Sequence, residues 1–209
     1  MIRLTSFVTL AVLSCSSLWA QMPQSFEVRW SRGYKDREIQ LDYVTSLDSS
    51  YFMTYGSYVK LLRKRKNFYA RYDRETMTQV WQIEETLDRY RDAPVGFHSM
   101  VTFGPTTYVF YQAYSKADDL RYVLMRTIDP EGNLSEFNEL VRISAKRWTM
   151  GDFRISWNRD ATSFAIVSFP GEDRKEDLRV EVKRFDREGN PVGGASVQVD
   201  HAKNRVALA

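Results

Sequence analysis

Phe-Asp-Arg-Glu-Gly-Asn at residues 185–190 is the third occurrence of one motif in this chain. The second is Ile-Asp-Pro-Glu-Gly-Asn at 128–133, and the first is Tyr-Asp-Arg-Glu at 72–75. Aligned on their aspartates, the three occurrences lie 56 and 57 residues apart, so a unit of one size is repeated. Periods near this length are typical of β-propeller blades, which are four-stranded sheets that bury their faces against neighbouring sheets. The repeat therefore predicts an all-β fold, a partial β-propeller of about three four-stranded antiparallel blades plus an N-terminal strand.

Each repeat contains four segments with the composition of β-strands, separated by turn residues. The repeats span about residues 39–84, 96–143 and 153–199 of a domain expected at 21–209, and a further strand is expected at 26–30. The predicted strands are 39–45, 51–59, 67–72 and 77–83 in the first unit, 97–103, 107–114, 120–128 and 134–143 in the second, and 153–157, 163–168, 178–185 and 191–199 in the third.

The second strand of each unit is apolar or aromatic at nearly every position, as in Tyr-Val-Phe-Tyr at 108–111 and Phe-Ala-Ile-Val at 164–167. A strand with one wet face would alternate between apolar and polar residues. We therefore expect these strands to be covered on both faces, as inner strands are when sheets stack on one another.

The repeated aspartates Asp73, Asp129 and Asp186 have a structural explanation. An aspartate at a turn accepts hydrogen bonds from backbone amides just ahead of it. The pairs Gly132 with Asn133 and Gly189 with Asn190 are expected to supply the positive φ angles of these hairpins. We assign the three aspartates to turn closure rather than to catalysis.

The first 20 residues have the composition of an export signal, with Arg3, an apolar stretch and small residues up to Ala20. Cleavage after Ala20 would leave a mature chain without cysteine, so without disulfides or thiolate metal sites. The alternative is a lipobox at 12–15, in which Cys15 is acylated and becomes the mature N-terminus. The first alternative predicts a bacterial protein that is secreted, periplasmic or on the outer surface, and the second predicts a lipoprotein.

Charged residues are nearly balanced, with 30 Lys and Arg against 27 Asp and Glu and a net charge of +3 at pH 7. This balance excludes the strong basic bias of proteins that bind nucleic acid. Twelve Tyr, twelve Phe and five Trp among 209 residues favour β structure and argue against disorder.

The segment 153–166, Phe-Arg-Ile-Ser-Trp-Asn-Arg-Asp-Ala-Thr-Ser-Phe-Ala-Ile, resembles the hairpin of the TolB-type, WD40-like propeller repeat. That hairpin runs aromatic-Ser-Pro-Asp-Gly and then Ile-Ala-Phe. Asn158 and Arg159 stand at its Ser and Pro positions, and Ala161 replaces its Gly. The resemblance covers this hairpin well and the other two units less well. It implies a propeller with a binding role in the periplasm or on the outer surface.

The residues show no catalytic or metal-binding set. Only His98 and His201 are present, fewer than the three or four ligands that a zinc site needs. The chain also lacks a Gly-x-Ser-x-Gly segment. The acidic pairs at 84–85, 118–119 and 172–173 fall in or beside predicted loops and are interpreted as solvated charge. We therefore predict no catalytic residue, no cofactor and no metal, with His98 a packed or surface residue.

Two features remain as candidate binding residues. The run at 60–66 carries Lys60, Arg63, Lys64, Arg65 and Lys66 on a hairpin tip, where it could bind an anionic lipid or polysaccharide surface or could simply be a solvated loop. The three tryptophans at positions 81, 148 and 157 lie near strand starts, where they could stack on sugars. Packing between blades is the expected role of each.

These observations predict an exported, non-enzymatic propeller that binds a protein or glycan partner. Two alternatives remain open: the N-terminal propeller portion of a secreted hydrolase, either a peptidase or a glycosidase, and a lipid-anchored assembly factor. Three blades do not close a flat ring, since propellers close with about four to eight. Further blades of a longer protein, or self-association, are therefore expected to cover the end sheets.

Overall fold

The computed structural model describes residues 40–46, 51–60, 64–87, 89–170 and 178–199, all within one compact unit spanning 34–209. In these ranges every regular element is a β-strand. A search of the same residues for a helix that is long and apolar enough to cross a membrane finds none. The predicted export signal with Cys15, the strand expected at 26–30 and the tail from His201 lie outside the described residues.

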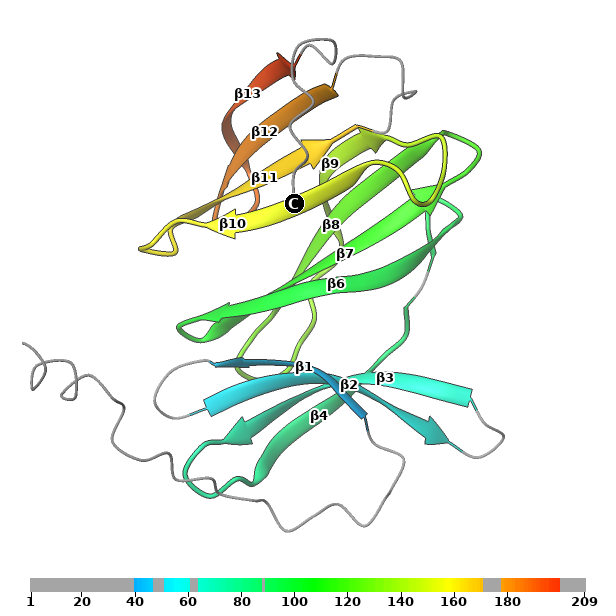
Figure 1. The fold of residues 1–209 in the computed structure, drawn as a ribbon. Coiled ribbons are helices and arrows are strands. Elements are labelled where there is room, and N and C mark those ends of the chain that lie inside the picture. Colours follow the sequence, from blue (N-terminus) through cyan, green and yellow to red (C-terminus); the bar gives the residue numbers. More distant parts are fainter. Residues whose placement is uncertain (1–39, 47–50, 61–63, 88, 171–177, 200–209) are drawn as a thin grey trace, which may run out of the picture. The chain divides into compact units, whose positions relative to one another are not determined.

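The strands form three antiparallel sheets in chain order, here called blades 1 to 3 (Figure 1). In every sheet each strand pairs with the next one along the chain. This arrangement confirms the all-β, propeller-like fold class. Blade 1 consists of β1 (Gln40–Ser46), β2 (Tyr51–Lys60), β3 (Lys64–Asp73) and β4 (Gln79–Glu85); blade 2 of β5 (Arg89–Tyr90), β6 (Ala93–Phe103), β7 (Thr106–Ser115), β8 (Leu120–Ile128) and β9 (Asn138–Ser144); blade 3 of β10 (Asp152–Trp157), β11 (Ser163–Phe169), β12 (Leu178–Asp186) and β13 (Pro191–Val199).

Blade 2 differs from the prediction at its first and last strands. The two-residue strand β5 was not predicted, and it pairs through Tyr90 with Ala93 at an early start of β6. The last strand begins at Asn138 rather than at Leu134, which makes only an isolated bridge to Ile128. The intervening Ser135 instead receives the Thr127 amide on its hydroxyl, so the ladder is interrupted there.

The repeated aspartates close their turns as predicted. Asp129 Oδ1 accepts the amides of Glu131 (3.0 Å) and Asn133 (2.8 Å), and Asp186 Oδ1 accepts the amide of Asn190 (2.7 Å). Side-chain and backbone hydrogen bonds from Asn133 hold the pKa of Asp129 below its ordinary value. The carboxylates therefore stabilise the bends on which the repeat was aligned.

The asparagines of these turns have a different role from the one predicted. Positive φ is found at Gly132 (93°) and Gly189 (85°) and not at Asn133 or Asn190. Each asparagine donates its Nδ2 hydrogen to the turn carboxylate, at 2.8 Å from Asp129 and 2.9 Å from Asp186. The side-chain hydrogen bond, rather than backbone freedom, explains asparagine at this position.

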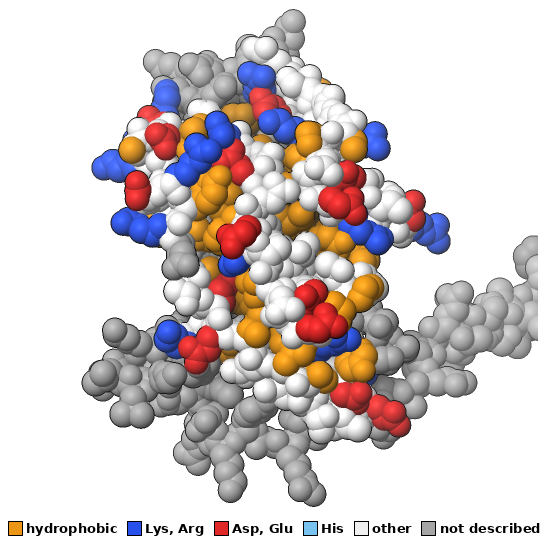
Figure 2. Space-filling view, turned by 180° about the vertical axis from the view of Figure 1, so that it is seen from behind, with side chains coloured by type: hydrophobic (Ala, Val, Ile, Leu, Met, Phe, Trp, Pro, Cys, Tyr) orange, Lys and Arg blue, Asp and Glu red, His pale blue; other side chains and the backbone are white. Residues whose placement is uncertain are grey.

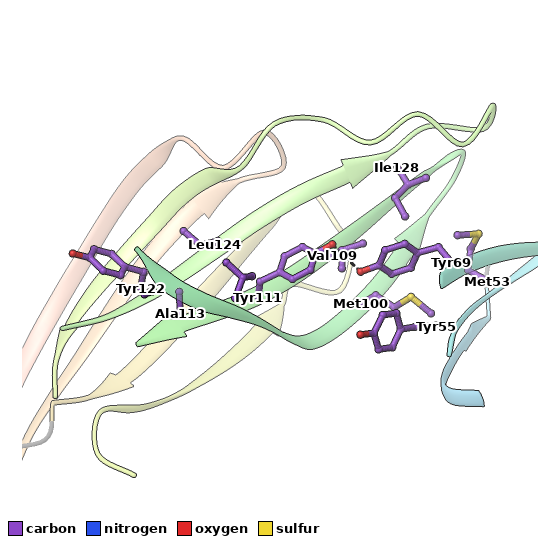
Figure 3. Close-up of a cluster of buried hydrophobic side chains, with 12 residues drawn as sticks. Met53, Tyr55, Tyr69, Met100, Val109, Tyr111, Ala113, Tyr122, Leu124 and Ile128 are labelled. Carbon is purple, nitrogen blue, oxygen red and sulfur yellow. Dashed lines mark hydrogen bonds between the residues drawn. The ribbon is translucent and has the colours of Figure 1, made fainter. Parts of the chain in front are cut away.

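One apolar core joins blades 1 and 2 (Figure 3). Tyr55 of β2 stacks on Phe97 of β6 with ring centroids 3.8 Å apart, and Tyr69 and Tyr111 bring their hydroxyl ends together from β3 and β7. Blades 1 and 2 therefore share one core, as sheets that stack face to face do.

A second core joins blades 2 and 3. Phe110 of β7 meets Phe164 of β11 edge-on at 5.5 Å, and Phe164 stacks on Phe185 of β12 at 5.3 Å. Trp157 packs against Phe103 and Phe164, each at 4.8 Å between centroids, so its expected packing role is confirmed.

The aspartate turns of blades 2 and 3 also rest on the outermost strand of the preceding blade. Gly132 of blade 2 faces the ring of Trp81 in β4, and a Cβ built on Gly132 would lie 3.2 Å from that ring. Trp81 Nε1 and Arg71 Nη1 both donate to the carbonyl of Pro130 in the same turn, each at 2.9 Å. Trp81 therefore packs between blades, as predicted.

The same contact recurs one blade later. A Cβ on Gly189 of blade 3 would lie 2.6 Å from Asn138 Nδ2 in β9 and 3.1 Å from Leu140 Cδ2. Asn138 also donates to the carbonyl of Glu188 in this turn (3.4 Å). Since one contact is built twice from different side chains, the turn is part of the interface between blades and not only a reversal of the chain.

The face of blade 3 turned away from blade 2 is only half-covered. Along β11 the exposure alternates, with Phe164 and Ile166 buried and Ala165 and Val167 half-buried. The prediction that all second strands are covered on both faces is thus wrong for blade 3, although it is correct for β7, where residues 107–111 are all buried. The reason is that no described sheet packs against this face of blade 3.

Candidate functional site

The boundary between blades 2 and 3 contains two pockets. The first, here called the Trp148 pocket, has a volume of about 530 Å³ and is lined by polar and aromatic side chains from both blades and from the loop between them. Binding pockets of small ligands have volumes of about 300–1,000 Å³. The lining residues that carry chemistry are Gln112, Tyr114, Arg121, Trp148, Thr149 and Asp152.

The strand register explains why these polar side chains converge. Tyr114 of β7 pairs directly with Arg121 of β8, and Gln112 lies two residues earlier on β7. Residues two apart on a strand project from the same face. Further along the same strand, this face contributes Phe110 to the core with blade 3, so the pocket continues that interface with polar residues at its edge.

Arg121 connects the two sides of the pocket. Its Nη1 donates to Gln112 Oε1 (2.5 Å), and its Nη2 donates to the backbone carbonyl of Trp148. Burial lowers the pKa of Arg121, and the nearby Asp152 acts in the opposite direction. Because arginine stays charged at any physiological pH, the guanidinium holds both the Gln112 amide and the Trp148 loop in place.

The loop that carries Trp148 is tightly folded against β9. Ala145 donates its amide to the carbonyl of Asp119 (2.8 Å), and Met150 donates to the carbonyl of Arg147 (2.9 Å). Gly151 has a φ of 71°, and a Cβ there would lie 2.9 Å from the Ala145 side chain. Only glycine fits both this backbone and this space. The loop therefore presents Trp148 in a defined position.

Trp148 is the exception among the tryptophans of the repeat, since 72% of its surface is exposed. The prediction that it packs between blades is wrong. A large aromatic side chain that is exposed beside a pocket is an informative departure from burial. The sequence signal that could have identified it is its place in a loop, between Lys146-Arg147 and Thr149, rather than in a strand.

The second pocket, here called the His98 pocket, has a volume of about 570 Å³ and is mainly apolar. It lies between β6 and β10, where the ring of His98 stacks on Phe153 at 4.4 Å. His98 Nδ1 lies 2.9 Å from Ser99 Oγ, and burial lowers the pKa of the imidazole. His98 is thus a packed residue, as predicted, and is uncharged at neutral pH.

Glu85 is the largest departure from the sequence interpretation of the acidic pairs. It is only 5% exposed, although it was assigned to solvated loop charge. Tyr69 donates to Glu85 Oε2 (2.9 Å), Tyr111 donates to Oε1, and the two hydroxyls lie 2.7 Å apart. A polar ring of three groups therefore joins blade 1 to blade 2.

This ring has three contacts but only two hydroxyl protons. A third proton on the Glu85 carboxyl gives every contact a donor, because the carboxyl then donates to one tyrosine and the proton of that tyrosine is free to reach the hydroxyl of the other. Burial raises the pKa of Glu85, while its hydrogen bonds from the tyrosines and the charge of Arg126 act in the opposite direction. Burial also raises the pKa values of Tyr69 and Tyr111, so both hydroxyls keep their protons.

The raised pKa of Glu85 predicts a pH dependence of stability. A carboxyl whose pKa is higher in the folded state stabilises the fold fully below its ordinary value of 4.5, and this contribution is lost as pH rises through the folded value. We expect Glu85→Gln to have a flatter stability profile above pH 4.5 than the original chain. Urea unfolding at several pH values measures this, and parallel profiles for the two proteins would contradict it.

The basic run lies on the β2–β3 hairpin, where Lys60 pairs with Lys64 and Val59 with Arg65. Lys66 Nζ lies 3.7 Å from Glu84 in an exposed ion pair. Arg63 falls outside the described residues, as do Cys15, Glu172 and Asp173. Among the described residues no group of three His, Cys, Asp or Glu could hold a metal ion. Binding of an anionic surface by this run stays a prediction.

Positive and negative side chains are interspersed on the face of the molecule that Figure 2 shows. Viewed from behind (Figure 2), Lys and Arg alternate with Asp and Glu, and hydrophobic side chains reach the surface between them. This agrees with the nearly balanced composition of the chain.

No protein-family model matches the chain, and no curated protein matches it. Among solved structures, it is similar to the β-propeller domain of the Trilobed protease from Pyrococcus furiosus, with a TM-score of 0.44, 11% identity, and 79% of this chain and 44% of that chain covered. It is also similar to an acylaminoacyl peptidase from Pyrococcus horikoshii, with a TM-score of 0.43, 13% identity, and 82% and 27% covered. The chain thus spans less than half the length of either.

These similar structures contradict one expectation from the sequence. Both are described as a protease or peptidase or as a domain of one. The prediction that the protein is not an enzyme is therefore contradicted. The likeness itself concerns the arrangement of the sheets only.

Proposed function

We propose that this chain forms blades of an exported β-propeller that binds a ligand in the Trp148 pocket, between blades 2 and 3. The observation that carries the proposal is an exposed tryptophan whose backbone is held by Arg121, beside a pocket into which polar side chains converge. Preorganised groups of this kind lower the entropy lost when a ligand binds. Pockets with convergent polar side chains at the boundary of two packed units are the usual place for such sites.

We propose the bacterial envelope as the location, on the basis of the export signal at residues 1–20 and the alternative lipobox at Cys15. The TolB-type affiliation is part of the same proposal. It is supported by the hairpin at 153–166, in which Trp157 pairs with Phe164 and Ala161 takes the positive φ (57°) of the glycine it replaces. The hydrolase alternative is compatible with this site, since a propeller pocket would then hold substrate for a domain elsewhere.

Nuclear magnetic resonance of the full chain tests the pocket. We expect a panel of small saccharides, dipeptides and carboxylates to contain members that shift the Trp148 indole and the Gln112 side-chain amide. The indole signals of Trp81 and Trp157 serve as internal controls and should stay fixed, because both rings pack between blades. Shifts confined to other residues, or no shift with any member of the panel, would overturn the proposal.

A second proposal concerns the half-covered face of blade 3, which we assign to contact with a second copy of this chain. Val182 pairs with Ala195 and Val180 with Val197 on this face, so it presents small aliphatic side chains. Arg184 stands two residues before Asp186, as Arg71 stands two residues before Asp73, and Arg71 binds the turn of the neighbouring blade. The face therefore has both the apolar surface and the arginine of an interface between blades.

Sedimentation of two matched variants tests this contact. Val197, 57% exposed, lies on the outward face, whereas Val192, 54% exposed, lies at the irregularity where Phe185 pairs with Pro191. We expect the original chain to associate with rising concentration, Val197→Glu to remain monomeric, and Val192→Glu to associate like the original. A chain that is monomeric at every concentration would contradict the proposal.

A further inference from the structure

The side chains that line the Trp148 pocket indicate the chemical class of its ligand. The exposed indole of Trp148 provides a flat apolar surface in the lining of the pocket, which also includes Pro94 and Gly96. Polar groups come from the other lining side chains, Gln112, Tyr114, Arg121, Thr149 and Asp152. A ligand that matches this arrangement has one apolar face and a rim of hydrogen-bonding groups. Aromatic side chains suit such ligands because their faces are apolar and rigid.

The pocket contains both hydrogen-bond donors and hydrogen-bond acceptors that a ligand could use. Gln112 Oε1 already accepts from Arg121, which leaves the two N–H donors of this amide without a partner among the described residues. Asp152 Oδ1 accepts the amide of Phe153, and its Oδ2 makes no hydrogen bond in the same part of the chain. Tyr114 and Thr149 add hydroxyls that both donate and accept. Donors and acceptors thus alternate around one space.

The charges of the pocket cancel. Arg121 contributes one positive charge and Asp152 one negative charge, and the other lining residues are neutral. A site for an anion would need an excess of donors with positive charge. Both terminal nitrogens of Arg121 already donate, to Gln112 and to the Trp148 carbonyl, and its Nε is buried, although it has no partner among the described residues. A neutral ligand therefore fits the pocket better than a carboxylate or a phosphate.

An extended peptide fits less well. Peptides that bind to sheets add a strand to a free edge and pair with its backbone. At the edge of β10 next to the pocket, the Phe153 amide already donates to the Asp152 carboxylate at 2.9 Å. A side chain in that position blocks pairing, as charged residues do on edge strands.

Resting on the proposed function of this pocket, the geometry points to a neutral saccharide as its ligand. A pyranose ring has an apolar face of C–H groups that stacks on the Trp148 indole. Its hydroxyls both donate and accept, so they pair with the Gln112 amide, the free Asp152 oxygen and the Tyr114 hydroxyl. A volume of about 530 Å³ accommodates a short oligosaccharide rather than a single small ion.

Titration of the full chain with five probes tests this inference. The probes are N,N′,N″-triacetylchitotriose, maltotriose and cellotriose, which are neutral, trigalacturonic acid as the anionic sugar, and the tripeptide Ala-Gln-Ala. We expect at least one neutral trisaccharide to shift the Trp148 indole and Gln112 side-chain signals. Its dissociation constant should change less than about twofold between about 50 and about 500 mM salt, because the contact involves no net charge.

Two variants show whether the indole is the platform. Trp148→Ala should weaken binding of that trisaccharide by about tenfold, and Trp148→Phe by less, because a phenyl ring keeps an apolar face. Val192→Glu, an exposed substitution away from the pocket, should leave binding unchanged. Equal effects of Trp148→Ala and Val192→Glu would overturn the stacking contact.

The outcomes separate this inference from the proposed function. If only trigalacturonic acid or Ala-Gln-Ala shifts the pocket signals, the pocket binds a ligand but the neutral saccharide is wrong. If none of the five probes shifts any of these signals, the saccharide inference fails, and the wider panel of carboxylates and dipeptides then decides the proposed function.

Discussion

Tyr111→Ala is expected to lower the free energy of unfolding by about 3–5 kcal/mol, the range for deleting a large aromatic side chain from a core. Tyr111 is fully buried between blades 1 and 2, where its ring contacts Phe97 and its hydroxyl contacts Glu85 and Tyr69. Removing it leaves a cavity and takes a donor from a buried carboxyl. Urea unfolding followed by fluorescence measures the loss, because the free energy of unfolding of a two-state protein falls linearly with denaturant concentration.

Two matched variants separate the ring from the hydroxyl. Tyr111→Phe should cost about 1–3 kcal/mol, because Glu85 loses one of its buried donors while the packing is kept. Tyr114, half-buried on the same strand, is the control, and Tyr114→Ala should cost clearly less than Tyr111→Ala. Equal losses at Tyr111 and Tyr114 would contradict a shared core between the blades.

Gly189→Ala is expected to cost about 2–5 kcal/mol. Its φ of 85° adds the strain of a left-handed conformation, about 1–2 kcal/mol, and its new methyl group would add an overpacking cost of about 1–3 kcal/mol. The methyl group would meet Asn138, Met125 and Leu140 of blade 2 at 2.6, 2.9 and 3.1 Å. Urea unfolding measures the change.

Gly104 is the control for the backbone term. Its φ is also positive, at 56°, but a Cβ there meets nothing within 4 Å. Gly104→Ala should therefore cost only the strain of about 1–2 kcal/mol. A loss for Gly189→Ala no larger than that for Gly104→Ala would show that the turn of blade 3 does not rest on blade 2.

Most of what could be predicted about the fold came from the repeated motif. The aspartate turns marked corresponding corners, and the strands between them were found close to their predicted bounds because each has turn residues at both ends. The positive φ of Ala161, 57°, was not predicted, because alanine rarely adopts this conformation. Local patterns were sufficient wherever the cause was local, as in turn closure by Asp129 and Asp186.

The misses concern residues whose role depends on a neighbouring blade. Glu85 is acidic and follows a charged residue, and only its tyrosine partners on β3 and β7 explain its burial. Trp148 is a large aromatic residue of the kind that usually packs in a core. It is exposed because it lies in a loop whose backbone is held by the Arg121 hydrogen bond and by the conformation of Gly151. Val167 was expected to be covered because it is apolar, yet its cover depends on a partner for blade 3.

The central claim is that each repeat is a blade, and that the aspartate turns of blades 2 and 3 rest on the blade before them. A double-mutant cycle between Gly132 and Trp81 tests it most directly, because a Cβ on Gly132 would lie 3.2 Å from the Trp81 ring and the two residues lie in different blades. We predict that Gly132→Ala costs at least about 1 kcal/mol less in Trp81→Ala than in the original chain, a coupling typical of residues in contact. Costs that add to within about 0.5 kcal/mol, as for distant sites, would contradict the docking of one blade on the next.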